Sequence, residues 1–169
     1  MRLHKARPHD AAQIHQLIDH YARKGLLLPR SLDEITAHAS HFVVAKRDGA
    51  IVGCAALERY HDGLGELRSL AIAETERGHG IGRELLKAVL RRARLAGLER
   101  VFAVTHAPQF FMDGGFERAA EIVPEKIARD CQTCAKFGRC KLVTVVAQTA
   151  RMACRTTQTL PTELPILAS

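Results

Sequence analysis

The chain has 169 residues, of which 47% are hydrophobic and 25% are charged, and its formal net charge is +7. This length suffices for one domain with a sizeable core and is too short for two ordinary domains. Because no apolar run approaches the ~20 residues of a membrane span and the first residues lack the apolar core of a signal peptide, we expect a cytoplasmic protein.

The first segments read as a strand followed by two helices. Residues 2–6 predict a short strand, and the Asp-x-x-Gln spacing of Asp10 and Gln13 indicates a helix start. One face of that first helix is apolar, comprising Ile14, Leu17, Ile18 and Tyr21. The spacing of Ser31 and Glu34 then predicts a capping box for a short second helix.

The loop between these helices, residues 25–30, contains three consecutive leucines. Connecting loops are usually polar and exposed, so this composition predicts either a loop folded over a cleft or a partner, or one tucked into the core. A partner could be a second copy of the chain, giving a homodimer.

Three strands are expected next. Two apolar runs, residues 42–46 and 51–57, flank Asp48-Gly49, a strong hairpin-turn signal, so they should pair antiparallel. A third strand is predicted at residues 64–72. Its alternation places Glu66, Arg68, Leu70 and Ile72 on one face, provided that no bulge intervenes.

A glycine-rich loop joins this strand to an amphipathic helix. The loop comprises Arg77, Gly78, His79, Gly80, Ile81 and Gly82. Glycines let the backbone approach an anion closely, and a helix start offers unpaired N–H groups, so the loop predicts a phosphate cradle. It fits neither a P-loop nor a Gly-x-Gly-x-x-Gly motif. A plain glycine-rich turn is the alternative.

The remaining elements complete a crossover unit. Residues 101–104 predict a strand buried on both sides, and residues 108–112 a short helix ending at Gly114-Gly115. Residues 124–130 suggest a helical turn and residues 141–147 a last strand. The stretch 148–169 shows no periodicity, and we expect a flexible tail.

This order of elements, with Arg-x-x-Gly-x-Gly after an extended strand, resembles the GNAT N-acetyltransferase superfamily. Three stretches are similar to its N-acetylglutamate synthases, particularly the short bacterial form: residues 20–31 (HYARKGLLLPRS), residues 65–72 (GELRSLAI) and the PEK of residues 124–126 leading to DCQTC at residues 130–134. The resemblance implies an α/β (α+β) fold, one GNAT-type domain over residues 1–147, with helices on both faces of a mixed sheet. It also implies a V-shaped splay between the fourth and fifth strands.

The resemblance implies acetyl-CoA as co-substrate and assigns two catalytic roles. Glu66 matches the glutamate that many GNAT enzymes use as a base, acting through water, although a simple ion pair with Arg68 or another cation is the alternative. Thr105 matches a hydroxyl position and is a weak candidate for the general acid. The thiolate of CoA can also leave without one.

Cofactor contacts are expected along the third strand and the glycine-rich loop. Main-chain N–H groups near Leu70, Ala71 and Ile72 would bind the pantetheine arm and the oxyanion. The chain from Arg77 to Gly82 would hold the pyrophosphate.

For the acceptor, the resemblance implies a basic pocket that holds a dicarboxylate. The expected substrate-binding residues are Arg30, Arg68, Ser69, Lys126 and Arg139. Guanidinium groups bind carboxylates in strong, oriented forks. The alternative is that Lys126 and Arg139 are ordinary exposed cations.

Cys131, Cys134 and Cys140 form a cluster whose first pair has metal-like spacing. Structural zinc usually takes four ligands, so Cys54, Cys154 or a distant His would have to complete the site. Reduced packing thiols and a redox-sensitive pair are the alternatives.

The function expected is acetyl-CoA-dependent acetylation of the α-amine of L-glutamate, the first step of arginine biosynthesis. One alternative keeps acetyl-CoA but uses another small amine or amino acid as acceptor. The other is a non-catalytic module that senses acetyl-CoA or binds nucleic acid, although dispersed cations and 5% aromatic residues disfavour nucleic acid.

Overall fold

The computed structural model describes residues 1–61, 63–120, 123–132, 134 and 140–149. Its strands are β1 (Arg2–Lys5), β2 (Phe42–Arg47), β3 (Ala50–Arg59), β4 (Leu64–Ile72), β5 (Arg100–Thr105), β6 (Glu117–Arg118) and β7 (Val143–Gln148). Its α-helices are α1 (Ala11–Arg23), α2 (Leu32–Ala37), α3 (Ile81–Leu95), α4 (Pro108–Asp113) and α5 (Pro124–Lys126), the last continuing as a π-helical turn over Ile127–Cys131. Short 3-10 turns lie at Pro8–Asp10, Ala39–His41 and Glu74–Glu76.

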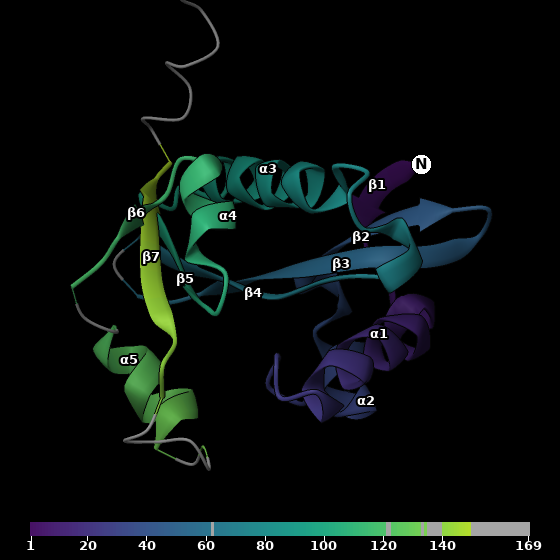
Figure 1. Ribbon diagram of the computed structural model, residues 1–169, viewed down its shortest axis with the longest axis horizontal. Helices are drawn as coiled ribbons and strands as arrows, with labels where there is room; N and C mark the ends of the chain where they lie inside the picture. The colour runs from purple at the N-terminus through teal and green to yellow at the C-terminus, as the bar shows by residue number, and fades with distance from the viewer. Residues whose placement is uncertain (62, 121–122, 133, 135–139, 150–169) are drawn as a thin grey trace, which may run out of the picture.

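One seven-stranded mixed sheet has the order β1-β2-β3-β4-β5-β7-β6. The helix α3 covers one face, and α1 and α2 cover the other (Figure 1). Each face has its own apolar cluster, one built on α3 and one on α1, so the predicted fold class is confirmed. No helix in the described part of the chain is both long and apolar enough to cross a membrane.

The first helix begins where expected, at Ala11 directly after Asp10, but the Asp10 side chain does not cap it. Asp10 is buried and accepts a hydrogen bond from the backbone N–H of Arg7, while Gln13 accepts one from the N–H of Ile51 on β3. The two side chains therefore hold the preceding turn and the sheet, not the helix N-terminus. At α2 the prediction holds, because the Ser31 hydroxyl accepts the N–H of Glu34.

The leucine loop, residues 25–30, is partly tucked into the core and partly exposed, so each of the two alternatives holds for part of it. Leu27 packs against the α1 core, whereas Leu26 and Leu28 are 47% and 39% exposed. The loop thus has one anchored leucine between two that face outward.

The hairpin turn and the amphipathic helix match the sequence. Asp48 and Gly49 both have positive φ, as a two-residue hairpin turn requires. The apolar face of α3 is fully buried, comprising Ile81, Leu85, Leu86, Val89, Leu90 and Ala93.

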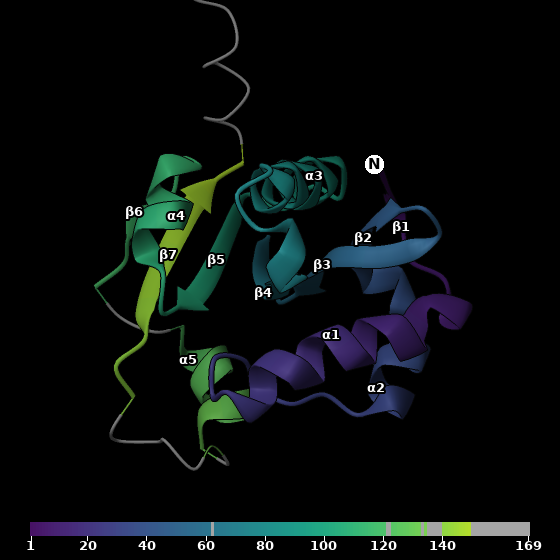
Figure 2. The same cartoon turned by 45° about the vertical axis from the view of Figure 1, so that its right-hand side comes forward.

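The strands β4 and β5 run parallel and separate after a short paired stretch. Their partners are Leu64 with Arg100, Gly65 with Val101 and Glu66 with Phe102, and no described pair follows. From there β5 continues alongside β7 (Figure 2). The predicted splay is present, and Glu66 is the last paired residue before it opens.

A β-bulge in β4 overturns the expected alternation. Cys54 pairs with Ala71 and Ala56 with Arg68, so Ser69 and Leu70 together face one residue of β3. Ser69 takes a φ of 54°, in the left-handed region. The extra residue reverses the phase of the strand. Leu67, between Glu66 and Arg68, packs in the α3 cluster, so Glu66 and Arg68 lie on the opposite face of the strand, while Leu70 and Ile72 pack toward α3.

The last strand extends one residue past the expected boundary, through Gln148. The Thr149 hydroxyl then donates to backbone carbonyls of Leu98 and Glu99. Residues 150–169 lie outside the described residues, so a flexible tail stays a prediction.

The bulge generates a stability prediction at Ser69. A β-branched residue is strained at positive φ, so we expect Ser69→Val to lower the free energy of unfolding by about 1–3 kcal/mol. Ser69→Gly, the matched control, should change it by less than about 1 kcal/mol. Urea unfolding measures both, and a valine variant more stable than the glycine variant, as in a regular strand, would contradict the bulge.

Candidate active site

Glu66 is a buried carboxylate at the point where the sheet splits. Its residue exposure is 2%, and both of its oxygens are engaged. The Tyr60 hydroxyl donates to Oε2 at 2.9 Å, and Lys126 Nζ lies 2.6 Å from Oε1. The hairpin explains Tyr60: Glu58 pairs with Glu66, so Tyr60 lies diagonally across from Glu66 on the same face.

This environment shifts two titrating groups. Burial raises the pKa of Glu66 above its usual value of 4.5, and Lys126 and Tyr60 only partly offset that effect. Burial and the neighbouring Glu66 charge also raise the pKa of Tyr60, which therefore remains a hydrogen-bond donor. A carboxylate whose pKa is raised toward neutrality is suited to proton transfer.

Three cations from distant parts of the chain converge on Asp130. Lys126 Nζ lies 2.5 Å from Asp130 Oδ2, Arg68 Nη2 lies 3.7 Å away and Arg30 Nη2 lies 3.9 Å away. Arg30 precedes α2, Arg68 is on β4, and Lys126 ends α5. We call Arg30, Arg68 and Lys126 the cation cluster.

Two donors of the cation cluster are buried without a hydrogen-bond partner. They are Arg30 Nε and Arg68 Nη2. Arg68 Nη1 is 4.0 Å from Glu66, beyond hydrogen-bonding distance, so the close ion pair of Glu66 is the one with Lys126. The alternative that Glu66 pairs with a cation is thus met by Lys126, and the role of Glu66 as a base stays a prediction. Burying a guanidinium N–H donor without a hydrogen-bond partner costs about 1–3 kcal/mol. The cluster therefore retains capacity for an additional anionic group.

A second layer supports Tyr60. The Arg129 guanidinium lies over the Tyr60 ring, 4.9 Å from its centroid, and pairs with Glu58 at 3.3 Å. Glu58 also contacts His41 at 3.3 Å. These contacts fix the ring whose hydroxyl holds Glu66.

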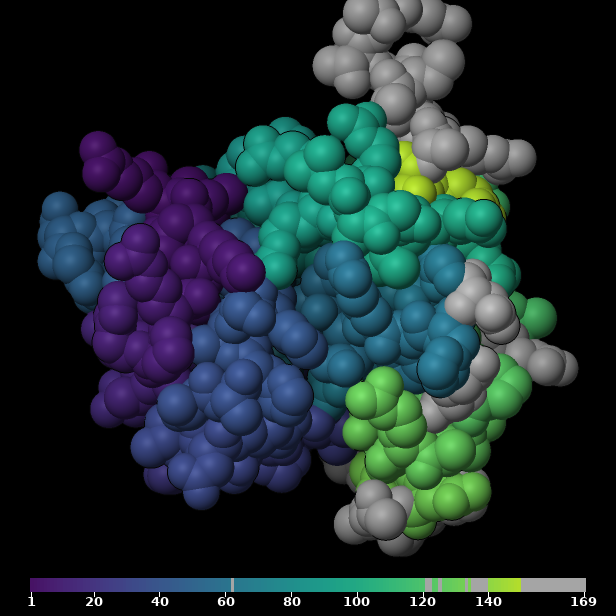
Figure 3. All heavy atoms as spheres, turned by 180° about the vertical axis from the view of Figure 1, so that it is seen from behind, coloured from purple at the N-terminus to yellow at the C-terminus, as the bar shows by residue number. Residues whose placement is uncertain are grey.

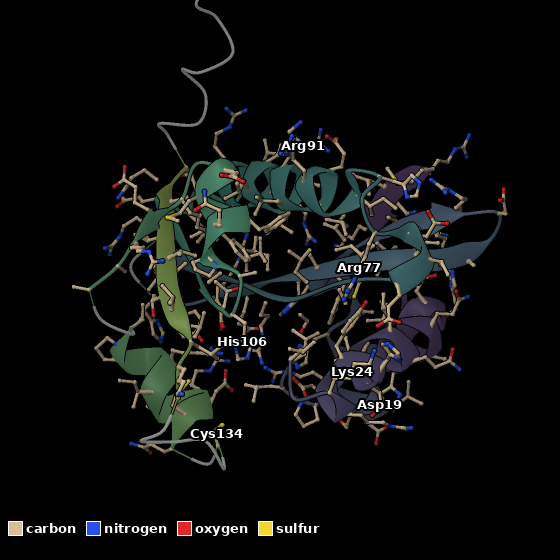
Figure 4. All side chains as sticks on the ribbon, in the orientation of Figure 1. Asp19, Lys24, Arg77, Arg91, His106 and Cys134 are labelled. Atoms are coloured by element: carbon tan, nitrogen blue, oxygen red, sulfur yellow. The ribbon has the colours of Figure 1, made fainter. Side chains whose placement is uncertain are left out.

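The glycine-rich loop is open where a phosphate group would approach. Gly78 and Gly80 have φ of 81° and 78°, and a Cβ at either would meet no atom within 4 Å. Gly80 precedes the first residue of α3. The Arg77 guanidinium stacks on Tyr21, beside α1 (Figure 4). The loop thus combines an accessible backbone with a helix N-terminus.

The other expected residues are placed as follows. Leu70, Ala71 and Ile72 lie on β4 beyond the splay, and His79 is exposed. The Thr105 hydroxyl accepts the Ala107 N–H at the end of β5, so it helps to form a turn. Arg139 lies outside the described residues. The roles of these residues stay predictions.

The cysteines do not assemble a metal site in the part of the chain that is described, where no group of three or more His, Cys, Asp or Glu could hold an ion. Cys131, Cys134 and Cys140 are free thiols. Cys54 is fully buried, its Sγ donates to the Ser69 carbonyl at 3.5 Å, and burial raises its pKa to about 12. Cys54 packs in the apolar cluster built on α1, and Cys154 lies outside the described residues.

Sequence reasoning missed Tyr60 and Asp130. A local pattern in the sequence could have indicated each of them. Tyr60 follows from the hairpin register once Glu58 is paired with Glu66, and Asp130 lies four residues after Lys126, on the same helical face. The convergence of Asp130 with Arg30 and Arg68 is a long-range contact without such a signal.

The raised pKa of Glu66 generates a prediction about stability. Between 4.5 and the folded pKa, the folded protein binds more protons than the unfolded chain, so the free energy of unfolding falls as pH rises. We expect the stability of the wild type relative to Glu66→Gln to decrease as the pH rises above about 4.5. Urea unfolding across this range measures the difference; a constant or increasing difference would contradict the raised pKa.

Comparisons with known proteins identify the family of the chain. Residues 9–116 match the acetyltransferase (GNAT) family. An uncharacterized N-acetyltransferase of Chlorobaculum tepidum is 37% identical over 142 residues, which cover 83% of this chain and 92% of the relative. An amino-acid acetyltransferase of Mycobacterium tuberculosis is 38% identical over 66% of each chain. Another, from Ralstonia nicotianae, is 39% identical over 69% of this chain and 26% of its own length.

Two solved structures share the fold. N-acetylglutamate synthase from Neisseria gonorrhoeae, complexed with coenzyme A and N-acetyl-glutamate, has a TM-score of 0.79 at 28% identity, over 88% of this chain and 35% of that one. A Mycobacterium tuberculosis protein in complex with CoA has a TM-score of 0.74 at 29% identity, over 88% of this chain and 99% of that one. The chain thus spans only about a third of the gonococcal enzyme.

The family match covers most of the chain, and the first of these relatives matches along nearly its whole length. The enzyme hypothesis is thereby confirmed over the non-catalytic one. The chain belongs to the GNAT family of acetyltransferases.

Proposed function

We propose that the protein transfers the acetyl group of acetyl-CoA to the α-amine of L-glutamate, as an N-acetylglutamate synthase of arginine biosynthesis. One observation carries the proposal: a buried carboxylate at the splay adjoins a cation cluster with two unfilled donors. A base and a carboxylate-binding group are what this acceptor requires.

The donor side rests on the glycine-rich loop. Its open backbone at Gly78 and Gly80 fits a pyrophosphate, and the separation of β4 from β5 leaves room for an extended arm beside Leu70 to Ile72. Two structural neighbours bind coenzyme A, which supports acetyl-CoA as the co-substrate.

The chemical step uses Glu66 as the base. Each carboxylate oxygen has two acceptor sites, so Glu66 can accept a water proton while it is bonded to Tyr60 and Lys126. The ammonium passes one proton through that water to Glu66, and its nitrogen attacks the thioester carbon. The tetrahedral intermediate then collapses with cleavage of the C–S bond, and the second proton of the nitrogen goes to the departing sulfur, so that the products are the amide and the CoA thiol. Lys126 favours the ionised form that accepts the proton.

The acceptor side rests on Arg30 and Arg68. Their unfilled donors are suited to a carboxylate, and guanidinium groups orient such a group strongly. The names of the relatives point in the same direction, since several are amino-acid acetyltransferases and one neighbour was solved with N-acetyl-glutamate.

The direct test is an acceptor screen with purified protein and acetyl-CoA, measured as free thiol released. L-Glutamate should give the highest kcat/KM among the amino acids and simple amines. Thiol release with glutamate no faster than with L-alanine would reject glutamate as acceptor and favour the alternative of a different small amine.

Removal of the base should slow the chemistry without weakening donor binding. We expect Glu66→Gln to lower kcat by ~10²–10⁴ and to leave the KM for acetyl-CoA unchanged. Glu84→Gln, on the exposed face of α3, is the matched control and should retain full activity. Unchanged turnover in Glu66→Gln would rule out Glu66 as the general base.

Removal of a cluster guanidinium should act on the acceptor alone. Arg68→Gln loses a charge-assisted contact, so we expect the KM for glutamate to rise at least about tenfold, with the KM for acetyl-CoA within about twofold. Arg91→Gln, on the outer face of α3 (Figure 4), is the control. Equal effects of the two substitutions would remove Arg68 from the acceptor site.

A further inference from the structure

Asp130 lies on the π-helical turn that follows α5, and its Oδ2 is the shared neighbour of the whole cation cluster. We propose that Asp130 is an internal carboxylate that competes with the side-chain carboxylate of the acceptor, and thereby sets how strongly the site favours a charged over an uncharged acceptor. This inference rests on the proposed function and deepens it.

Asp130 satisfies one member of the cluster and leaves the other two unfilled. Its contact with Lys126 is short, whereas 3.7 Å to Arg68 and 3.9 Å to Arg30 exceed hydrogen-bonding distance. Arg68 Nη2 and Arg30 Nε are buried without a hydrogen-bond partner. A carboxylate placed only to tie down these arginines would be expected to bond to them directly.

The charges around the cluster are already matched. Three cations face three carboxylates: Lys126 contacts Glu66 and Asp130, and Arg30 pairs with Glu34 at 2.9 Å. The side-chain carboxylate of an acceptor would add a further negative charge within a few ångströms of Asp130. Either it displaces Asp130 from the cluster, or it binds against the repulsion, and both outcomes weaken the binding of a dicarboxylate.

The position of Asp130 allows displacement. The cluster joins the segment before α2 to the segment after α5, and these two lie near each other below the sheet (Figure 2). In the surface view, α2 lies at the lower left of the molecule and α5 at the lower right (Figure 3). The Asp130 side chain is 16% exposed, more than that of Lys126, which is 6% exposed. Movement of Asp130 outward would leave Lys126 paired with Glu66.

The test compares L-glutamate with L-glutamine, which has nearly the same shape without the side-chain charge. Calorimetry of CoA-bound protein gives the Kd of each, and steady-state kinetics gives the KM. Asp130→Asn preserves shape and removes the charge, and Asp130→Ser is a second neutral variant. The control Glu84→Gln removes an exposed carboxylate of α3 that pairs with Lys87 and does not contact the cation cluster. Thermal unfolding checks that each variant is folded.

We expect Asp130→Asn to lower the Kd and KM for glutamate about tenfold, with glutamine changed less than about twofold and Glu84→Gln close to wild type. A rise in the glutamate constants would show that Asp130 only holds Lys126 in place, and equal decreases for both acceptors would show that it competes with the α-carboxylate, which the two acceptors share. The inference would then fail while the proposed function stands. A wild-type protein that acetylates neither amino acid would overturn the proposed function and this inference together.

Discussion

The site depends on one interaction: the buried Glu66 carboxylate is held between the Tyr60 hydroxyl and the Lys126 ammonium. A charge taken out of water is costly, and it is tolerated only where a counter-charge and hydrogen bonds replace the solvent. The fold supplies both at the last paired residue before β4 and β5 separate. The β3–β4 hairpin delivers Tyr60, and α5 delivers Lys126. The ion pair therefore joins the central sheet to the segment that precedes β7.

The same arrangement explains why the surrounding charges are organised in layers. Lys126 links Glu66 to Asp130, and Asp130 links the ion pair to the arginines that precede α2 and lie on β4. On the other side, Arg129 covers Tyr60 and pairs with Glu58. Buried ion pairs contribute little to stability compared with apolar packing of the same volume, which favours a functional role for this network. Its unfilled donors are consistent with a site built for a further anionic group.

Local patterns predicted most of the fold, and tertiary contacts account for what they missed. Turn chemistry at Asp48-Gly49 and the apolar stripe of α3 gave the right elements, because backbone conformation and amphipathicity decide both. The bulge at Ser69 was missed because serine carries no left-handed preference; its conformation is imposed by packing. Glu66 and the cation cluster followed from the family resemblance. The cluster meets at Asp130 because two segments that are 100 residues apart in the chain, at Arg30 and at Asp130, lie close together in the fold. No local spacing in the sequence encodes such a contact.

The central claim is that the ionised form of a buried Glu66 takes the proton from the acceptor. The most direct measurement is the dependence of kcat/KM for the acceptor on pH in the wild type and in Glu66→Gln. Because burial raises the pKa of Glu66, the acid limb of the wild-type profile should have its midpoint above 4.5, and the residual activity of the variant should lack that limb. The same acid limb in both proteins would contradict the account.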